Sequence, residues 1–373
     1  MVPLTLEANF TNEINKFFLY FIKEIMMNKF RCSPQTASTG AVLSAILLSA
    51  TFLNTVSAET VVFDDSEKWN QNYHVVPVSE GTEMTRSAAE QAALMETVMV
   101  TPAGKVTSVK ISEAAVRRMI QAIEDGEDGK LPKQEKASLG NPREAPGDRV
   151  DGMTQESVIG VDTRNKVNNT KSFPFRAAGR IAMGCTGTLI GPRHVLTAGH
   201  CVYNTSTDKW YSNLKFSPGQ NGASRPYGEI GWKLAISVKG WTKSHKSNYD
   251  YAMIVLKKNI GSSTGWMGYG YNNSLPDYNV NINGYPGDKP SGTQWHSYCN
   301  LRARWTYKLF YPCDTFNGMS GSGVYVYWPS SGTRRIYAIH TNGTGGCAST
   351  GVNCGTRIRS AVFYNLKSWK KKY

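Results

Sequence analysis

The stretch Leu196-Thr197-Ala198-Gly199-His200-Cys201 is typical of a short apolar strand that ends in a turn of small residues and presents an imidazole beside a cysteine. Short apolar or alternating runs of this kind recur after residue 156, separated by clusters of Gly, Asn, Ser and Pro. They lie at residues 180–183, 195–198, 252–256, 280–283, 322–327 and 336–339. Many short strands with turn signals between them predict an antiparallel all-β sandwich or barrel.

The end of the chain carries a helical pattern instead. Val362, Phe363, Leu366 and Trp369 fall on one face at helical spacing, and three lysines follow them at 370–372. The part after residue 156 therefore predicts an all-β domain with a C-terminal α-helix.

Charge divides the chain into two parts. The whole chain has 42 Lys and Arg against 28 Asp and Glu, a net charge of +14. Residues 157–373 hold 27 basic and 7 acidic residues, a net charge of +20, whereas residues 1–156 have a net charge of −6. Such an asymmetry suggests that the two parts of the chain are processed differently. The basic residues are scattered and no DNA- or RNA-binding motif accompanies them, so we expect no nucleic-acid partner.

The N-terminal region has the pattern of an export signal. An apolar run from Ala41 to Leu53 follows a basic stretch, and Val56-Ser57-Ala58 fits the rule of small residues at a cleavage site. The run is too short to cross a bilayer. We therefore predict a signal peptide region at residues 1–58, with Met26 or Met27 as alternative start sites, a secreted product, and no membrane association of the mature form.

Residues 59–156 are rich in charged and small residues. Within them, residues 111–123 show apolar positions at helical spacing, and residues 124–153 have the composition of a linker. We predict a propeptide at 59–156 that ends near Glu156, followed by the main domain at 157–373.

Cysteine usage fits an exported protein. Cys32 would leave with the signal peptide, and an even number of cysteines remains in the basic part. These six are Cys185, Cys201, Cys299, Cys313, Cys347 and Cys354. Six cysteines allow 15 connectivities, and sequential pairing is favoured because each bond then closes a short loop. No CxxC and no Cys/His cluster with zinc spacing occurs in the sequence, so we expect neither a metal nor a cofactor.

Three motifs carry candidate chemistry. His200 ends the strand quoted above, Asp250 stands at the mouth of the apolar strand 252–256, and Ser320 lies in Asn317-Gly318-Met319-Ser320-Gly321-Ser322-Gly323. Each motif alone also fits an ordinary turn or loop. Together they suggest a Ser-His-Asp arrangement in which the amides of Gly318 and Ser320 form an oxyanion hole.

The flanks of these motifs resemble the trypsin-like (chymotrypsin-fold) serine peptidases and, more narrowly, the bacterial glutamyl endopeptidases of the V8 type. The segments that carry the narrower resemblance are 157–160, 249–251, 284–289, 306–309, 340–343 and 355–358. The resemblance covers residues 157–373 and implies two antiparallel six-stranded β-barrels. It also implies that His200 is the general base, that Asp250 orients it and that Ser320 is the nucleophile.

The narrower resemblance further implies a specificity for glutamate. In that branch a histidine, a threonine and the mature N-terminal amine bind the substrate carboxylate, and the matching residues here are His340, Thr315 and Ser157. Residues 157–373 contain a single glutamate, Glu229, as expected of an enzyme that resists its own cleavage after Glu. The positive charge would also attract acidic protein or peptide substrates.

Two alternatives remain open from the sequence. Asp314 lies six residues before Ser320, where trypsin-like enzymes that cut after Arg or Lys carry an aspartate, so this specificity is the second candidate. Met319 stands where those enzymes place the aspartate that pairs with the new N-terminus, so activation must work differently here. A catalytically silent secreted binding protein is the third reading. For either enzyme we expect a monomer.

Overall fold

The computed structural model describes residues 88–112, 114, 116–117, 158–272, 278–347 and 351–373, and the backbone of residues 58–60. All of these residues belong to one compact unit, residues 55–373. The expected signal region up to residue 57, the linker 124–153, Glu156 and Ser157 lie outside the described residues. Of the helix expected at 111–123, the described residues 114, 116 and 117 are helical.

The first half of the 157–373 region forms an antiparallel sheet in the order β11-β12-β7-β6-β5-β10. Its strands are β5 (Ala178–Ile181), β6 (Thr186–Leu189), β7 (His194–Thr197), β10 (Phe216–Pro218), β11 (Trp232–Val238) and β12 (Ala252–Leu256). Phe216 of β10 exchanges two backbone hydrogen bonds with Ile230, which lies just before β11. The two ends of this six-stranded row therefore meet.

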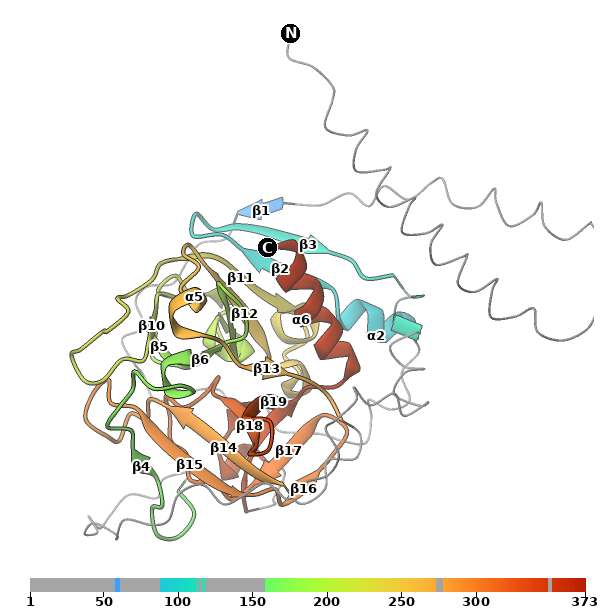
Figure 1. The fold of residues 1–373 in the computed structure, drawn as a ribbon. Coiled ribbons are helices and arrows are strands. Elements are labelled where there is room, and N and C mark those ends of the chain that lie inside the picture. The colour runs from blue at the N-terminus through green and yellow to red at the C-terminus, as the bar shows by residue number, and fades with distance from the viewer. Residues whose placement is uncertain are drawn as a thin grey trace, which may run out of the picture. The chain divides into compact units, whose positions relative to one another are not determined.

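The second half forms another sheet, in the order β16-β17-β20-β19-β18-β14-β15-β4, with β13 beside β19 (Figure 1). Its longer strands are β14 (Asn279–Gly284), β15 (Trp295–Asn300), β17 (Lys308–Tyr311), β18 (Gly323–Trp328), β19 (Thr333–Asn342) and β20 (Asn353–Arg357). The short additions are β4 (Asn165–Lys166), β13 (Gly268–Tyr269) and β16 (Ala303–Arg304). The predicted all-β class is confirmed, with a six-stranded row in the first half and six strands of four or more residues in the second.

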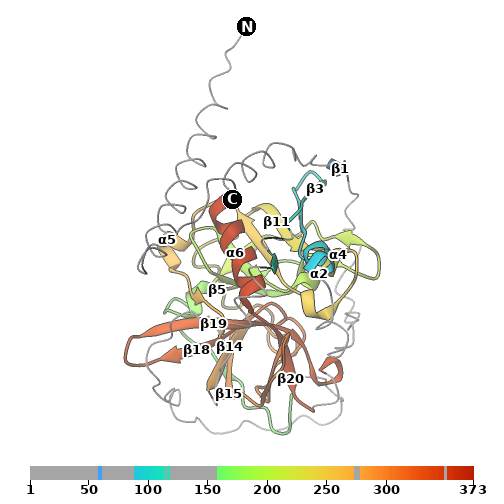
Figure 2. The same cartoon turned by 90° about the vertical axis from the view of Figure 1, so that its right-hand side faces the viewer.

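The two halves lie one above the other in Figure 2. Each is held together because its strands bury their apolar faces in a common core. Every residue of β12 is buried, as its uninterrupted apolar sequence requires. One apolar cluster fills the first half and a second fills the other half around Ile282 and Val324. The remaining elements connect these strands: β8 (Tyr203–Asn204), β9 (Lys209–Trp210), α4 (Lys239–Thr242), α5 (Gly261–Thr264), and the 3-10 helices at 175–177, 199–201, 247–249 and 344–346.

The C-terminal helix forms as predicted and is α6 (Ser360–Lys372). Its apolar face packs on the first half, where Val362, Leu366 and Trp369 are buried in the same cluster as β12. The Trp369 ring stacks on Tyr251 with 5.8 Å between centroids. Among the described residues, no helix has the length and apolar character needed to span a bilayer.

A segment ahead of residue 157 adds three strands to the first sheet, which the sequence reasoning missed. After α2 (Ala88–Leu94), strands β2 (Thr97–Val100) and β3 (Lys105–Val109) form a hairpin, and β2 pairs with β11. Strand β1 (Ala58–Thr60) pairs with β3. The first sheet therefore has nine strands, because residues 58–60, 97–100 and 105–109, which precede the predicted helix and linker, add β1, β2 and β3 to its edge.

The six cysteines are paired sequentially. The structure joins Cys185 to Cys201, Cys299 to Cys313 and Cys347 to Cys354. The first bond ties β6 to the turn after β7, which is the turn that carries His200.

Candidate functional site

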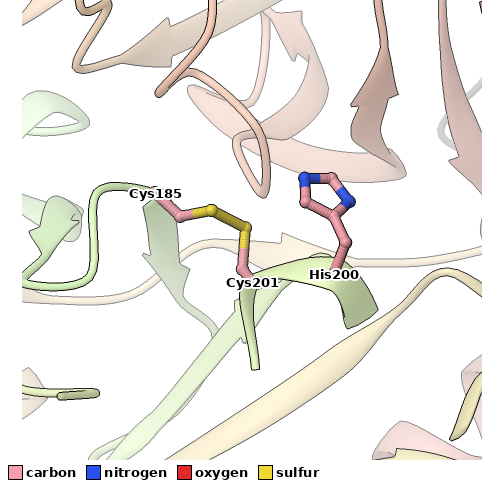
Figure 3. A group of neighbouring side chains, drawn as sticks. All are labelled: Cys185, His200 and Cys201. Carbon is pink, nitrogen blue, oxygen red and sulfur yellow. A yellow bond between two sulfur atoms is a disulfide. The ribbon is translucent and has the colours of Figure 1, made fainter. Parts of the chain in front are cut away.

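His200 lies in the short 3-10 helix η2 (Gly199–Cys201) that follows β7. The neighbouring Cys201 is fixed by its bond to Cys185, and Figure 3 shows the imidazole beside this disulfide. Gly199 is required because a Cβ there would lie 2.8 Å from the ring of Trp241. That ring packs edge-on against His200, with 6.4 Å between centroids. The imidazole is therefore held by packing as well as by its chain position.

Asp250 stands between the 3-10 helix η3 (Ser247–Tyr249) and β12 and is 2% exposed. Its Oδ2 lies 2.8 Å from His200 Nδ1, and its Oδ1 accepts the backbone N–H of His200 at 2.9 Å. Both carboxylate oxygens are therefore used to hold one residue. The pairing of β12 with β7 brings the two together, since Ala252 lies opposite Thr197.

The loop before β18 carries Ser320 and lies against the turn of His200. The Ser320 carbonyl accepts the N–H of Thr186 at 2.9 Å and lies 3.6 Å from Cys201 Sγ. Gly321 has φ +86°, and a Cβ there would overlap Thr197 and Thr186. Only glycine allows this close approach of the two halves.

The loop also presents backbone amides. Gly318 has φ +98°, and its carbonyl accepts the hydroxyl of Thr186 at 2.7 Å. The next amide, of Met319, is occupied by the Phe316 carbonyl. Among the described residues, no protein acceptor takes the N–H of Gly318 or of Ser320. These are the two amides that the sequence predicted as oxyanion donors, and their N–H groups are available for that role.

His340 is a buried residue of β19, 3% exposed, with its Nδ1 2.8 Å from the hydroxyl of Tyr311. Burial lowers the pKa of His340 to about 3, and the charges of His200 and Lys308 act in the same direction. The imidazole is thus neutral at physiological pH. Thr315 is fully buried, and its Oγ1 has no hydrogen-bond partner among the described residues.

Both carboxylate oxygens of Asp314 accept hydrogen bonds from within the protein, which decides a role that the sequence left undecided. Its Oδ1 accepts the N–H of Ile159 at 2.7 Å, and its Oδ2 accepts the N–H and the hydroxyl of Thr163 at 2.8 and 2.6 Å. The carboxylate is 2% exposed. It therefore anchors the segment that follows the expected processing point. Met319 is an apolar core residue, as its side chain requires.

Lys308 of β17 is a further residue that the sequence reasoning missed as an individual site. It is fully buried, and its Nζ donates to Thr341 Oγ1, Asn342 Oδ1 and Thr356 Oγ1 at 3.1 to 3.2 Å. Burial lowers its pKa to about 8, and the charge of Asp250 opposes this shift. Thr356 in turn donates to the carbonyl of Ser247, just before Asp250. A charged residue in the strand sequence Lys308-Leu309-Phe310-Tyr311 was the available signal.

Comparisons with known proteins place this chain among serine peptidases. A family model described as Trypsin matches residues 162–304. Glutamyl endopeptidase of Bacillus licheniformis is 43% identical over 245 residues, which cover 64% of this chain and 74% of that protein. A solved structure of a Glu endopeptidase in complex with MPD has a TM-score of 0.53 and 31% identity, and covers 58% of this chain and all of that one.

A second relative bears a name that implies a metal. The extracellular metalloprotease of Bacillus subtilis is 39% identical over 231 residues, which cover 59% of this chain and 72% of that protein. Within the described residues, the one group of three candidate ligands is Cys185, His200 and Cys201. Both sulfurs belong to a disulfide and cannot act as thiolate ligands, so these residues do not fit a metal ion (Figure 3).

Proposed function

Because the chain belongs to the trypsin-like serine endopeptidases, we propose that it is a secreted zymogen whose mature form cuts peptide bonds with His200, Asp250 and Ser320 and prefers glutamate at the P1 position. The mature form would begin at Ser157 and act as a monomer on protein or peptide substrates, without nucleic acid.

In this mechanism Ser320 attacks the scissile carbonyl while His200 accepts its proton and later passes it to the leaving amine. Asp250 binds Nδ1 of His200 at 2.8 Å, which keeps the acceptor lone pair on Nε2 and stabilises the imidazolium once it forms. Its second oxygen accepts the backbone N–H of His200, so one carboxylate fixes both the ring and the chain position of this residue. The amides of Gly318 and Ser320 would stabilise the oxyanion.

The main support for the proposed specificity is that both carboxylate oxygens of Asp314 are already hydrogen-bonded within the protein. An aspartate that binds a substrate Arg or Lys must offer free carboxylate oxygens, but both oxygens here accept hydrogen bonds from Ile159 and Thr163. This argues against cleavage after Arg or Lys. The same contacts favour a role for the new N-terminus, because Ser157 is two residues from Ile159 and its amine can reach within about 7 Å of that anchor.

His340 and Thr315 suit a substrate carboxylate. We assign the Tyr311 hydroxyl as the donor to His340 Nδ1, 2.8 Å away. The neutral imidazole then carries its proton on Nε2, which can donate to an anion. The Thr315 hydroxyl has no protein partner among the described residues and can donate as well. A buried carboxylate is tolerated only when it is hydrogen-bonded in this way. The near absence of glutamate after Glu156 supports the same specificity.

The test uses purified mature protein and three chromogenic peptides that differ only in Glu, Gln or Lys at the P1 position. We expect turnover of the Glu peptide, at least tenfold slower turnover of the Gln and Lys peptides, and no turnover by Ser320→Ala. Faster cleavage of the Lys peptide would refute the glutamate specificity and leave the triad intact. Lack of activity on every peptide, in a sample whose mass shows that the chain begins at Ser157, would instead favour the silent binding protein.

A further inference from the structure

The edge strand β11 is covered by the segment that precedes the catalytic region. Strand β2 pairs with β11 in antiparallel register, from Ala235 opposite Val100 to Val238 opposite Thr97. Strand β3 continues the sheet outward (Figure 1). Without this hairpin, β11 would present a row of unpaired N–H and C=O groups, which proteins generally avoid at a sheet edge.

The hairpin also contributes to the apolar core. Met95, Val98, Met99 and Val100 are each 6% exposed or less, and all belong to the same apolar cluster as the strands of the first half. Buried apolar side chains of this kind are the anchors of a stable interface. The segment is therefore packed into the catalytic region and not merely adjacent to it.

Polar contacts fix the register of the docked segment. The Lys239 ammonium lies 2.8 Å from Glu96 Oε1, and the Lys239 backbone N–H donates to the Glu96 carbonyl at 2.8 Å. Trp369 of α6 donates from Nε1 to Thr97 Oγ1 at 2.9 Å. The hairpin thus contacts β11, α4 and α6 at once.

Two of these contacts lead to the catalytic residues. Helix α4 carries Trp241, whose ring packs edge-on against His200. Trp369 stacks on Tyr251, the residue after Asp250. The hairpin therefore supports the elements that hold His200 and Asp250. Within the part of the chain that the structure describes, no hydrogen bond or ion pair joins it to Ser320, Thr315 or His340.

We propose that residues 88–109 stay bound after the chain is cut near Glu156, so that the working enzyme is a two-chain complex in which the hairpin completes the edge of β11. This inference rests on the proposed processing of the chain. Every contact described above involves residues before 110, so a cut near Glu156 breaks none of them. The occupant of this edge is thus a segment of the chain itself, bound by strand addition.

The experiment makes the cut without relying on the enzyme's own activity. A recognition sequence for a site-specific protease is placed between residues 124 and 153 of the full-length Ser320→Ala protein, which is then cut and passed through a sizing column. We expect the fragment that contains residues 88–109 to elute with residues 157–373 at a one-to-one ratio by mass spectrometry. Elution of the fragment by itself would overturn the proposal.

Two variants of the hairpin separate docking from a general effect of mutation. Val100→Asp buries a carboxylate at a position with no exposure, so the fragment should be released after the cut. Lys105→Asp alters an exposed residue of the same hairpin and should leave the fragment bound. If the Val100 variant does not fold, Glu96→Lys should weaken retention several-fold, and the added change Lys239→Glu should restore it. Failure of the double variant to regain retention would count against the assigned contact.

Hydrogen exchange tests the supporting role. Release of the fragment should speed exchange of the amides of β11 and α4 while leaving those of β14 and β18 unchanged. Equal exchange rates with and without the fragment would refute the support of the catalytic elements. A separate assay of the cut protein with active Ser320 on the Glu peptide reports on the proposed function, so the failure of one idea is distinguishable from the failure of the other.

Discussion

In the proposed recognition of glutamate, the hydroxyl of Tyr311 sets which nitrogen of His340 carries the proton, and its removal gives a sharp prediction. The variant Tyr311→Phe keeps the buried ring and deletes one oxygen, which lies 2.8 Å from His340 Nδ1. The Nδ1 atom then has no donor, and a neutral imidazole can place its proton on Nδ1 instead of Nε2. Because the pKa of His340 is lowered to about 3, protonation of the ring does not compensate in the free enzyme.

The size of the effect follows from the hydrogen bond that the substrate would lose. A bond to a charged group contributes about 1.5 to 3 kcal/mol, which corresponds to a loss of about 10- to 150-fold in kcat/KM. We expect this loss for the Glu peptide only, so the ratio of Glu to Gln turnover should fall. Tyr325→Phe removes a hydroxyl that lies 3.4 Å from Asn283 in the same half and is the matched control. An unchanged ratio in Tyr311→Phe would refute the proposed recognition.

Two further predictions concern buried charges. Asp314→Asn replaces an acceptor oxygen by an amide that faces the N–H of Ile159 or Thr163. The N-terminal segment should therefore loosen, and KM for the Glu peptide should rise about tenfold or more. A loss of activity confined to a Lys peptide would instead indicate the alternative specificity. Lys308 has its pKa lowered from 10.5 to about 8, so between these pH values the unfolded chain holds more protons and the free energy of unfolding rises with pH. Lys308→Met removes this term, and wild type should therefore gain in Tm relative to the variant as the pH rises from 7 to 10; a constant difference in Tm would contradict it.

The sequence could predict the catalytic strands because their signals are local. His200, Asp250 and Ser320 each follow or precede a short apolar run, and the turn residues around them are visible in the sequence. The C-terminal helix was equally accessible, since its apolar face repeats at a fixed spacing. The geometry of these parts depends on neighbours a few residues away.

The role of Asp314 could not be obtained in this way. Its partners Ile159 and Thr163 are 155 and 151 residues away in the chain, and no local pattern indicates that they meet. The same holds for Tyr311 and His340, which come from β17 and β19. Such contacts appear only when strands far apart in the sequence pair, so the sequence left the specificity open between two classes of substrate.

The missed hairpin is a different case, because a signal was present. Residues 97–100 form a short apolar run and residues 105–109 include three β-branched side chains, while Thr101-Pro102-Ala103-Gly104 between them has the composition of a tight turn. Gly104 indeed adopts φ +79°. The surrounding segment is so rich in charged residues that its overall composition indicates a propeptide without strands of its own. In addition, two strands alone are only marginally stable. Their order comes from β11, which supplies both a pairing edge and an apolar core, and this dependence is why the segment can fold only together with the domain that it precedes.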